Sequence, residues 1–115
     1  MSFELRTYTA TPGKIGALLD RFRDHTMSLF AEHGMESVGY WTKADDADVL
    51  VYLLHHAGDA RQNWAEFQAD PRWIEAKRAS EAGGALTSGI TSVFLQPTDF
   101  SPLGGVEASD AAAAV

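Results

Sequence analysis

A strand that turns directly into a helix, near the amino terminus, is the feature that most limits how this chain can fold. Residues 3–10, Phe-Glu-Leu-Arg-Thr-Tyr-Thr-Ala, favour a strand, and the Thr11-Pro12 sequence ends it. Over residues 12–33, apolar side chains then recur at steps of three and four, which predicts an amphipathic helix. Thr11 is suited to cap this helix, Pro12 to occupy its first position and Gly34 to end it.

The same pattern of strand, helix and strand comes a second time. Asp70-Pro71 is expected to break the second helical region. The remaining elements are predicted as strands over 36–43 and 49–56 with a turn at 45–48, a helical region over 58–83 and a last strand over 89–97. The order β-α-β-β-α-β is that of the ferredoxin-like motif. We therefore expect an α+β fold, with a four-stranded antiparallel sheet and its helices on one face.

The third predicted strand indicates that both sheet faces are covered. Its side chains form two alternating sets, and both sets are apolar: Val49, Val51, Leu53 and Leu50, Tyr52, Leu54. Since the helices cover only one face, the other face needs a partner. A second copy of the chain is the simplest one, and we expect a homodimer.

Composition excludes several classes of function. The formal charge of −7 argues against nucleic-acid and anionic-membrane surfaces, which require clustered lysine and arginine. The absence of cysteine removes thiolate chemistry and cysteine-ligated metals, and it fits a cytoplasmic protein. No signal peptide and no apolar run of ~20 residues is recognised. We expect one domain over residues 1–103 and a flexible tail over residues 104–115.

Several short sequences, in order along the chain, are similar to those of one family. They are Glu4-Leu5-Arg6-Thr7-Tyr8, Pro12-Gly13-Lys14, Glu32-His33-Gly34-Met35, Val38-Gly39-Tyr40-Trp41-Thr42, Ala69-Asp70-Pro71-Arg72-Trp73 and Pro97-Thr98-Asp99-Phe100-Ser101-Pro102. Together they resemble the NIPSNAP family over about residues 3–102. The resemblance implies a ferredoxin-like subunit that pairs sheet to sheet into a dimeric α+β barrel, with a pocket between the sheet and its own helices. The same superfamily includes antibiotic-biosynthesis monooxygenases, muconolactone isomerases and haem-binding relatives of chlorite dismutase.

The chain departs from the family pattern at one position. NIPSNAP-like sequences often carry a histidine in the third strand, followed by an aromatic residue. The position that matches this histidine is Val51 here, while His55 and His56 lie farther along the strand. A role of the family histidine is therefore not carried over to this chain.

Three residues are candidates for catalytic chemistry. Arg6 and Tyr8 alternate with Leu5 and Thr7, so they share one face of the sheet. If that face lines a cavity, Arg6 could bind an anionic or carbonyl oxygen and Tyr8 could donate a proton. His25, beside the apolar face of the first helix, is the third candidate. The structural alternative is an ion pair between Arg6 and an acid such as Glu4, with Tyr8 packed in the core.

Aromatic residues and a histidine are the candidates for ligand binding. Trp41, His55, Trp64 and Phe22 could line an apolar pocket, or they could fill a core or an interface. The four histidines lack the spacing of a metal site, and the adjacent His55 and His56 point to opposite faces of a strand. We expect no metal, no haem and no other cofactor.

Three functions remain open. The first is binding of a small, largely apolar molecule in a cavity of each subunit. The second is a cofactor-independent enzyme of the monooxygenase or isomerase type, in which His25, Arg6 or Tyr8 handles a proton or a developing oxyanion. The third is a dimerisation module without a ligand. An open cavity on which the three catalytic candidates converge would favour the enzyme.

Overall fold

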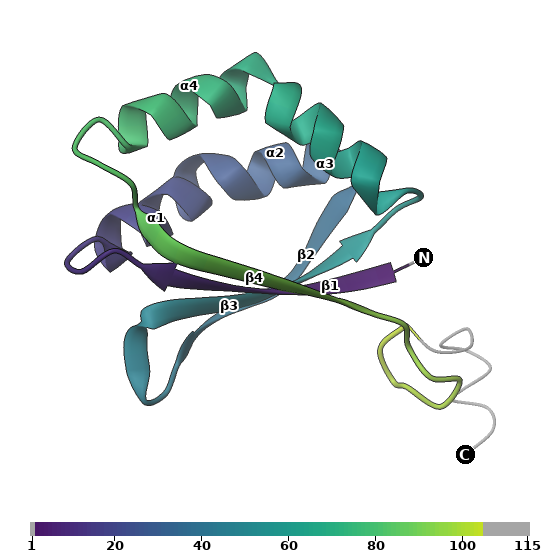
Figure 1. The fold of residues 1–115 in the computed structure, drawn as a ribbon. Coiled ribbons are helices and arrows are strands. Elements are labelled where there is room, and N and C mark those ends of the chain that lie inside the picture. The colour runs from purple at the N-terminus through teal and green to yellow at the C-terminus, as the bar shows by residue number, and fades with distance from the viewer. Residues whose placement is uncertain (1, 105–115) are drawn as a thin grey trace.

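A four-stranded antiparallel sheet carries all the helices on one of its faces. The computed structural model describes residues 2–104, and the strand order is β2-β3-β1-β4. The elements are β1 (Ser2–Ala10), α1 (Ile15–Arg21), the π-helical turn η1 (Phe22–Thr26), α2 (Met27–Glu32), β2 (Met35–Lys43), β3 (Asp46–His56), α3 (Ala60–Ala69), α4 (Pro71–Ser80) and β4 (Thr87–Leu95). Figure 1 shows the helices as one layer above the sheet and no helix below it. The ferredoxin-like α+β fold is confirmed, and all of the predicted tail except Gly104 lies outside the described residues.

The first helix begins later than the sequence predicts. Gly13 has a φ of 80°, in the left-handed region, so the chain is not yet helical there and α1 begins at Ile15. Thr11 does not cap the helix; its hydroxyl donates instead to the carbonyl of Ala85, over 2.8 Å. Gly34 ends the helix with a φ of 76°, as predicted.

One π-helical turn lies in the middle of this helix and places two successive side chains inside. The turn η1 separates α1 from α2, and the Thr26 hydroxyl donates to the carbonyl of Arg21 over 3.2 Å. A π turn contains one more residue than an α turn. Both Arg21 and Phe22 are buried at its start, although neighbours on a helix normally differ in exposure. An arginine thereby enters the layer between helices and sheet.

Asp70 separates the second helical region into two helices, as the Asp70-Pro71 sequence predicts. Its side chain accepts a hydrogen bond of 2.9 Å from the backbone N–H of Arg72, which caps α4. The same carboxylate lies 2.8 Å from Nε2 of His33, at the end of α2. The Arg72 guanidinium, and then His33, hold the pKa of Asp70 well below its usual range. One side chain therefore joins α2, α3 and α4.

Two strands differ from their predicted bounds by two residues or more. β3 begins at Asp46, because the hairpin between β2 and β3 is a tight turn at residues 44–45. β4 spans Thr87–Leu95, so it starts and ends two residues earlier than expected. The core lies between the helices and the sheet and includes Leu18, Leu29, Phe30, Met35, Leu50, Tyr52, Leu54, Phe67 and Leu86. No helix within residues 2–104 is long and apolar enough to cross a membrane.

Candidate functional site

Polar side chains of β1 face the helices. Glu4, Arg6 and Tyr8 lie opposite Leu54, Tyr52 and Leu50 of β3, which are core residues, whereas the alternate set that includes Leu5 and Thr7 lies on the other face. Arg6 and Tyr8 therefore share a face, as predicted, and this face is the inner one. The inner face of a strand is normally apolar, because a buried polar group costs free energy unless it is hydrogen-bonded. The hydrogen-bond partners of these side chains therefore have to be identified.

Glu4 is the buried centre of a hydrogen-bond network. Its side chain is 1% exposed, and Oε1 accepts from Nε2 of His56 over 2.7 Å and from Nε1 of Trp64 over 2.8 Å. Oε2 accepts from Arg6 over 2.8 Å and from the hydroxyl of Ser92 over 2.5 Å. Burial alone would raise the pKa of Glu4, but these hydrogen bonds outweigh it and lower the pKa to about 2. The carboxylate is thus ionised at neutral pH and fully partnered.

Arg6 links Glu4 to two tyrosine hydroxyls. Its Nε donates to the Tyr52 hydroxyl over 2.9 Å, and its Nη2 donates to the Tyr8 hydroxyl over 3.0 Å. The Tyr52 hydroxyl also donates to the Tyr8 oxygen over 2.9 Å. Because the Tyr8 oxygen accepts hydrogen bonds from both Arg6 and Tyr52, the Tyr8 O–H is not used as a donor to either of them. Arg6 further lies 4.2 Å from the centre of the Trp64 ring, which fixes the guanidinium against an aromatic face.

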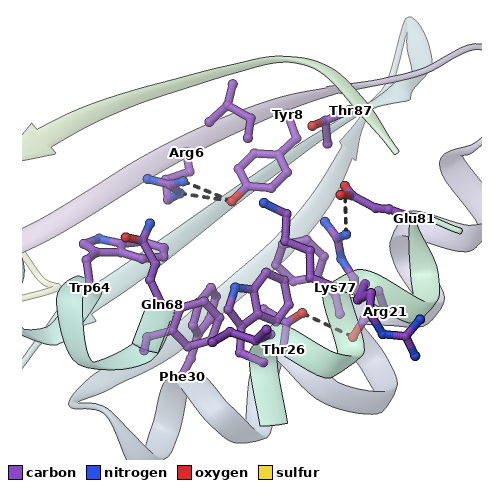
Figure 2. Close-up of a pocket in the computed structure, with 16 residues that line it drawn as sticks. Arg6, Tyr8, Arg21, Thr26, Phe30, Trp64, Gln68, Lys77, Glu81 and Thr87 are labelled. Carbon is purple, nitrogen blue, oxygen red and sulfur yellow. Dashed lines mark hydrogen bonds and ion pairs between the residues drawn. The ribbon is translucent and has the colours of Figure 1, made fainter. Parts of the chain in front are cut away.

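A cavity of about 500 Å³ opens between this part of the sheet and the helix layer. Its apolar walls are mainly aromatic, with five rings from η1, α2, α3 and α4: Phe22, Phe30, Trp64, Phe67 and Trp73. Its polar lining is Arg6, Tyr8, Arg21, Thr26, Gln68, Lys77, Arg78, Glu81 and Thr87. Figure 2 shows Tyr8 and Arg6 on the sheet side and Lys77, Gln68 and the indole of Trp64 on the helix side. The cavity has the size and mixed lining of a small-molecule site.

The structure brings four of the predicted site residues together. Arg6, Tyr8, Phe22 and Trp64 all line the cavity. Arg6 is paired with Glu4 as well, so the structural alternative and the cavity position are both true of this residue. Tyr8 is 7% exposed and has its ring edge against Phe22, at 5.7 Å between ring centres.

His25 does not join them. It is exposed and lines a separate surface depression with residues of α1 and α4 such as Asp20 and Ala76. The inward positions of this helix are Phe22, Thr26 and Phe30, and a residue just before Thr26 points about 100° away from that face. The expected convergence of His25 with Arg6 and Tyr8 is absent.

Trp41 and His55 lie on the opposite face of the sheet. Trp41 is opposite Val51 and is 54% exposed. His55 is opposite Phe3 and packs against its ring, with 4.8 Å between the ring centres, and its Nδ1 lies 3.4 Å from a carboxylate oxygen of Glu36. His56 is on the inner face, as the alternation of strand residues predicts. Neither Trp41 nor His55 can line the cavity, because the sheet separates them from it.

Other residues of the site are not evident from sequence patterns. Arg21 and Lys77 read as solvated helix residues, and Tyr52 reads as one apolar member of a strand. The regular alternation of Glu4, Arg6 and Tyr8 was the available signal for a polar inner face. The position of Arg21 depends on the π turn and on the packing of α4 against α1, and neither has a local sequence marker. Among the described residues, no group of three or more histidine, aspartate or glutamate side chains is arranged to hold a metal ion.

The fold and the aromatic cavity define a ferredoxin-like α+β protein with a site between its helices and its sheet. The family model NIPSNAP matches residues 3–102. The chain belongs to the NIPSNAP family, as its short sequence matches predicted.

Solved structures support the same assignment. A NIPSNAP family protein with unknown function from Agrobacterium tumefaciens is 27% identical and has a TM-score of 0.74, over 90% of this chain and 93% of that one. A NIPSNAP domain protein from Burkholderia xenovorans is 24% identical, with a TM-score of 0.72 over 89% of this chain and 99% of that one. A putative antibiotic biosynthesis monooxygenase from Nitrosomonas europaea shares the fold, at 15% identity and a TM-score of 0.61, over 84% of this chain and 98% of that one. No curated protein matches the chain.

Proposed function

We propose that this NIPSNAP protein binds a small, largely aromatic or apolar molecule in the cavity between its sheet and its helices. The observation that carries the proposal is that a cavity of about 500 Å³ is lined both by five aromatic rings and by Tyr8. Aromatic walls supply affinity through burial of apolar surface. The Tyr8 hydroxyl, held by Arg6 and Tyr52, supplies one oriented donor for an oxygen of the ligand.

The ligand-binding unit is proposed to be a homodimer. The sheet face away from the helices, which we call the open face, carries Leu5, Trp41, Val51, Leu53, Val93 and Leu95 among other residues. Trp41 and Val93 are about half exposed, at 54% and 52%. Lysine, arginine, aspartate and glutamate are absent from the open-face positions of β1 and from the positions of β3 and β4 paired with them, so two copies can pair over these three strands without repulsion between such side chains. An apolar surface of this kind is typical of an interface.

The enzyme hypothesis has less support than binding. It required His25, Arg6 and Tyr8 to meet at one empty volume, and only Arg6 and Tyr8 do so. Tyr8 remains a group that could polarise a carbonyl oxygen, but the described part of the cavity has no histidine to accept a proton. The likeness to a monooxygenase is a likeness of fold, which does not carry an activity.

A cavity-filling variant and its matched control test ligand binding. Gln68 lines the cavity, whereas Gln62, six residues earlier on α3, is exposed and does not. A neutral aromatic amide, 2-naphthamide, is titrated into wild type, Gln68→Trp and Gln62→Trp and followed by saturation-transfer NMR and calorimetry. Binding to wild type and Gln62→Trp with loss in Gln68→Trp is expected. Equal binding to the wild type and to both variants would place the probe elsewhere and refute the site.

A lysine on the open face tests the homodimer. Val93→Lys changes an exposed side chain, so the fold of the subunit is retained, but a dimer would have to bury the ammonium. Light scattering should give a dimeric mass for wild type and for the surface control Gln62→Lys, and a monomeric mass for Val93→Lys. A monomeric wild type at micromolar concentration would refute the dimer.

A further inference from the structure

The cavity is positively charged although the protein is acidic. The chain has a formal charge of −7, yet the charged residues that line the cavity are Arg6, Arg21, Lys77, Arg78 and the single acid Glu81. A cleft lined by one sign of charge concentrates ligands of the opposite sign. The question is which of these cations is available to a ligand.

Two of the four cations are already neutralised by acids outside the cavity. Arg6 is paired with the buried carboxylate of Glu4, at 2.8 Å. Arg78 is paired with Glu75 through Nε, at 2.9 Å, and through Nη2. Neither guanidinium needs a further anion, so the remaining charge is that of Arg21 and Lys77 against Glu81.

Arg21 is buried with an unused donor. Its side chain is 5% exposed and lies 5.1 Å from the ring centre of Trp73. Nη1 reaches the hydroxyl of Ser80 at 3.2 Å and a carboxylate oxygen of Glu81 at 3.4 Å, which is a long contact for an ion pair. Nε finds no acceptor within residues 2–104. Nε is closed to solvent, so a ligand in the cavity meets this guanidinium at Nη2, which forms no hydrogen bond within the same residues and is not closed off. Donors of a charged group that lack an acceptor cost free energy, so an anion at this position is favoured.

Lys77 supplies a second donor at the same end of the cavity. It lies one turn before Glu81 on the side of α4 that lines the cavity, and it forms no ion pair with another described residue. In Figure 2 its side chain extends from the helix toward the strand that carries Tyr8. A lysine ammonium is free to reorient about its flexible stem, so it can follow a ligand that Arg21 holds in a fixed orientation.

We propose that the ligand of this cavity is an aromatic carboxylate, whose carboxylate group is bound by Arg21 and Lys77 while its ring lies among Trp73, Phe22 and Phe67. The inference rests on the proposed function and adds the ligand's charge to it. A carboxylate is the anion that fits, because one free N–H and one ammonium match its two oxygens and its single charge. A phosphate dianion would face Glu81 with more charge than these two donors compensate. The Tyr8 hydroxyl is then left for an oxygen at the opposite end of the ligand.

A pair of isosteric probes separates charge from shape. 2-Naphthoate and 2-naphthamide have the same rings and differ in the charge of the terminal group. Dissociation constants are measured by calorimetry at pH 7 and at two salt concentrations. Since a charge-assisted hydrogen bond contributes more than a neutral one, we expect the dissociation constant of 2-naphthoate to be lower than that of 2-naphthamide by about tenfold or more. The preference should shrink in high salt.

Two variants with a matched control assign the effect to named residues. Lys77→Met keeps the alkyl stem and removes the charge, and it is expected to lower the preference for the acid several-fold while amide binding is kept. Arg23→Gln removes one positive charge from an exposed pair with Asp20, away from the cavity, and should leave the preference unchanged. Arg21→Lys is the second variant, and melting temperatures of both report on the fold.

The outcomes are distinguishable. If acid and amide bind equally to the wild type, or if Lys77→Met keeps the full preference as Arg23→Gln does, the carboxylate inference is wrong and binding in the cavity stands. If neither probe binds at millimolar concentration, the proposed binding function is overturned and the inference with it.

Discussion

Replacement of Glu4 by glutamine should be one of the most costly single-atom changes in this protein at neutral pH. Glu4→Gln exchanges one carboxylate oxygen for an amide nitrogen and keeps the size of the side chain. The carboxylate accepts four hydrogen bonds, from Arg6, His56, Trp64 and Ser92. Glutamine has only one side-chain oxygen, so its NH₂ group must take the place of the other oxygen and face N–H or O–H donors instead of accepting from them. The Arg6 guanidinium also loses its counter-ion.

The size of the effect follows from the pKa of Glu4. Folding lowers this pKa from 4.5 to about 2, and each unit corresponds to about 1.4 kcal/mol, so ionised Glu4 stabilises the fold by about 3 kcal/mol. Because the folded pKa is the lower one, this stability is fully present above pH 4.5 and is lost as the pH falls through about 2. At pH 3 about 1 kcal/mol of it should remain. Glutamine does not titrate, so the variant lacks this pH dependence.

Urea unfolding at pH 7 and pH 3, followed by tryptophan fluorescence, measures the effect. The free energy of unfolding should differ between wild type and Glu4→Gln by about 3 kcal/mol at pH 7 and by clearly less at pH 3. Glu66→Gln, on the exposed surface of α3, serves as the control and should match the wild type at both pH values. If the difference for Glu4→Gln were the same at both pH values, the carboxylate would not be ionised and partnered as described.

Three further changes test separate parts of the structure. Tyr52→Phe removes a buried hydroxyl that bridges Arg6 and Tyr8, and we expect a loss of about 1–2 kcal/mol in urea unfolding, with weaker binding of 2-naphthamide. Gly34→Ala should lower the melting temperature, since Gly34 has a φ of 76° and an added Cβ would lie 3.0 Å from a side-chain atom of Asn63; an unchanged melting temperature would contradict this. Asp59→Ala removes the side-chain cap of α3 and should cost about 1 kcal/mol in urea unfolding, whereas Asp59→Asn should cost little.

The fold could be predicted because its signals are local. The change from alternating to three-and-four spacing near Pro12, the Asp70-Pro71 break and the glycine at position 34 each mark an element boundary, and the order of elements then gives the topology. The start of the first helix was misplaced for the same reason. Pro12 suits a helix start, but it equally suits the second position of a β-turn. The Lys14 N–H donates to the Thr11 carbonyl over 2.8 Å, and Gly13 takes the left-handed conformation at the third position of that turn.

The candidate site could be predicted only in part. Arg6 and Tyr8 were identified because strand alternation needs no knowledge of the partner strands. His25 was misplaced because it is close in sequence to the inward positions of its helix yet about 100° from them. Arg21 and Tyr52 were missed because the position of each depends on long-range packing, of α4 against α1 in one case and of β3 against β1 in the other. Charge on a helix surface and a tyrosine in an apolar strand carry no sign of such contacts.

The polar inner face of β1 has a consequence for how the strand finds its place in the sheet. A shift of β1 by one residue would turn Leu5 and Thr7 toward the helices and Glu4 and Arg6 outward. In most strands the hydrophobic effect opposes such a shift. In β1 the hydrophobic effect would not oppose it, because the shifted strand buries apolar side chains and exposes charged ones. The partners of Glu4 on β3, α3 and β4 are therefore what distinguishes the native alignment from its neighbour. Substitutions that remove these partners of Glu4 would weaken that distinction, so misaligned chains should accompany the loss of stability.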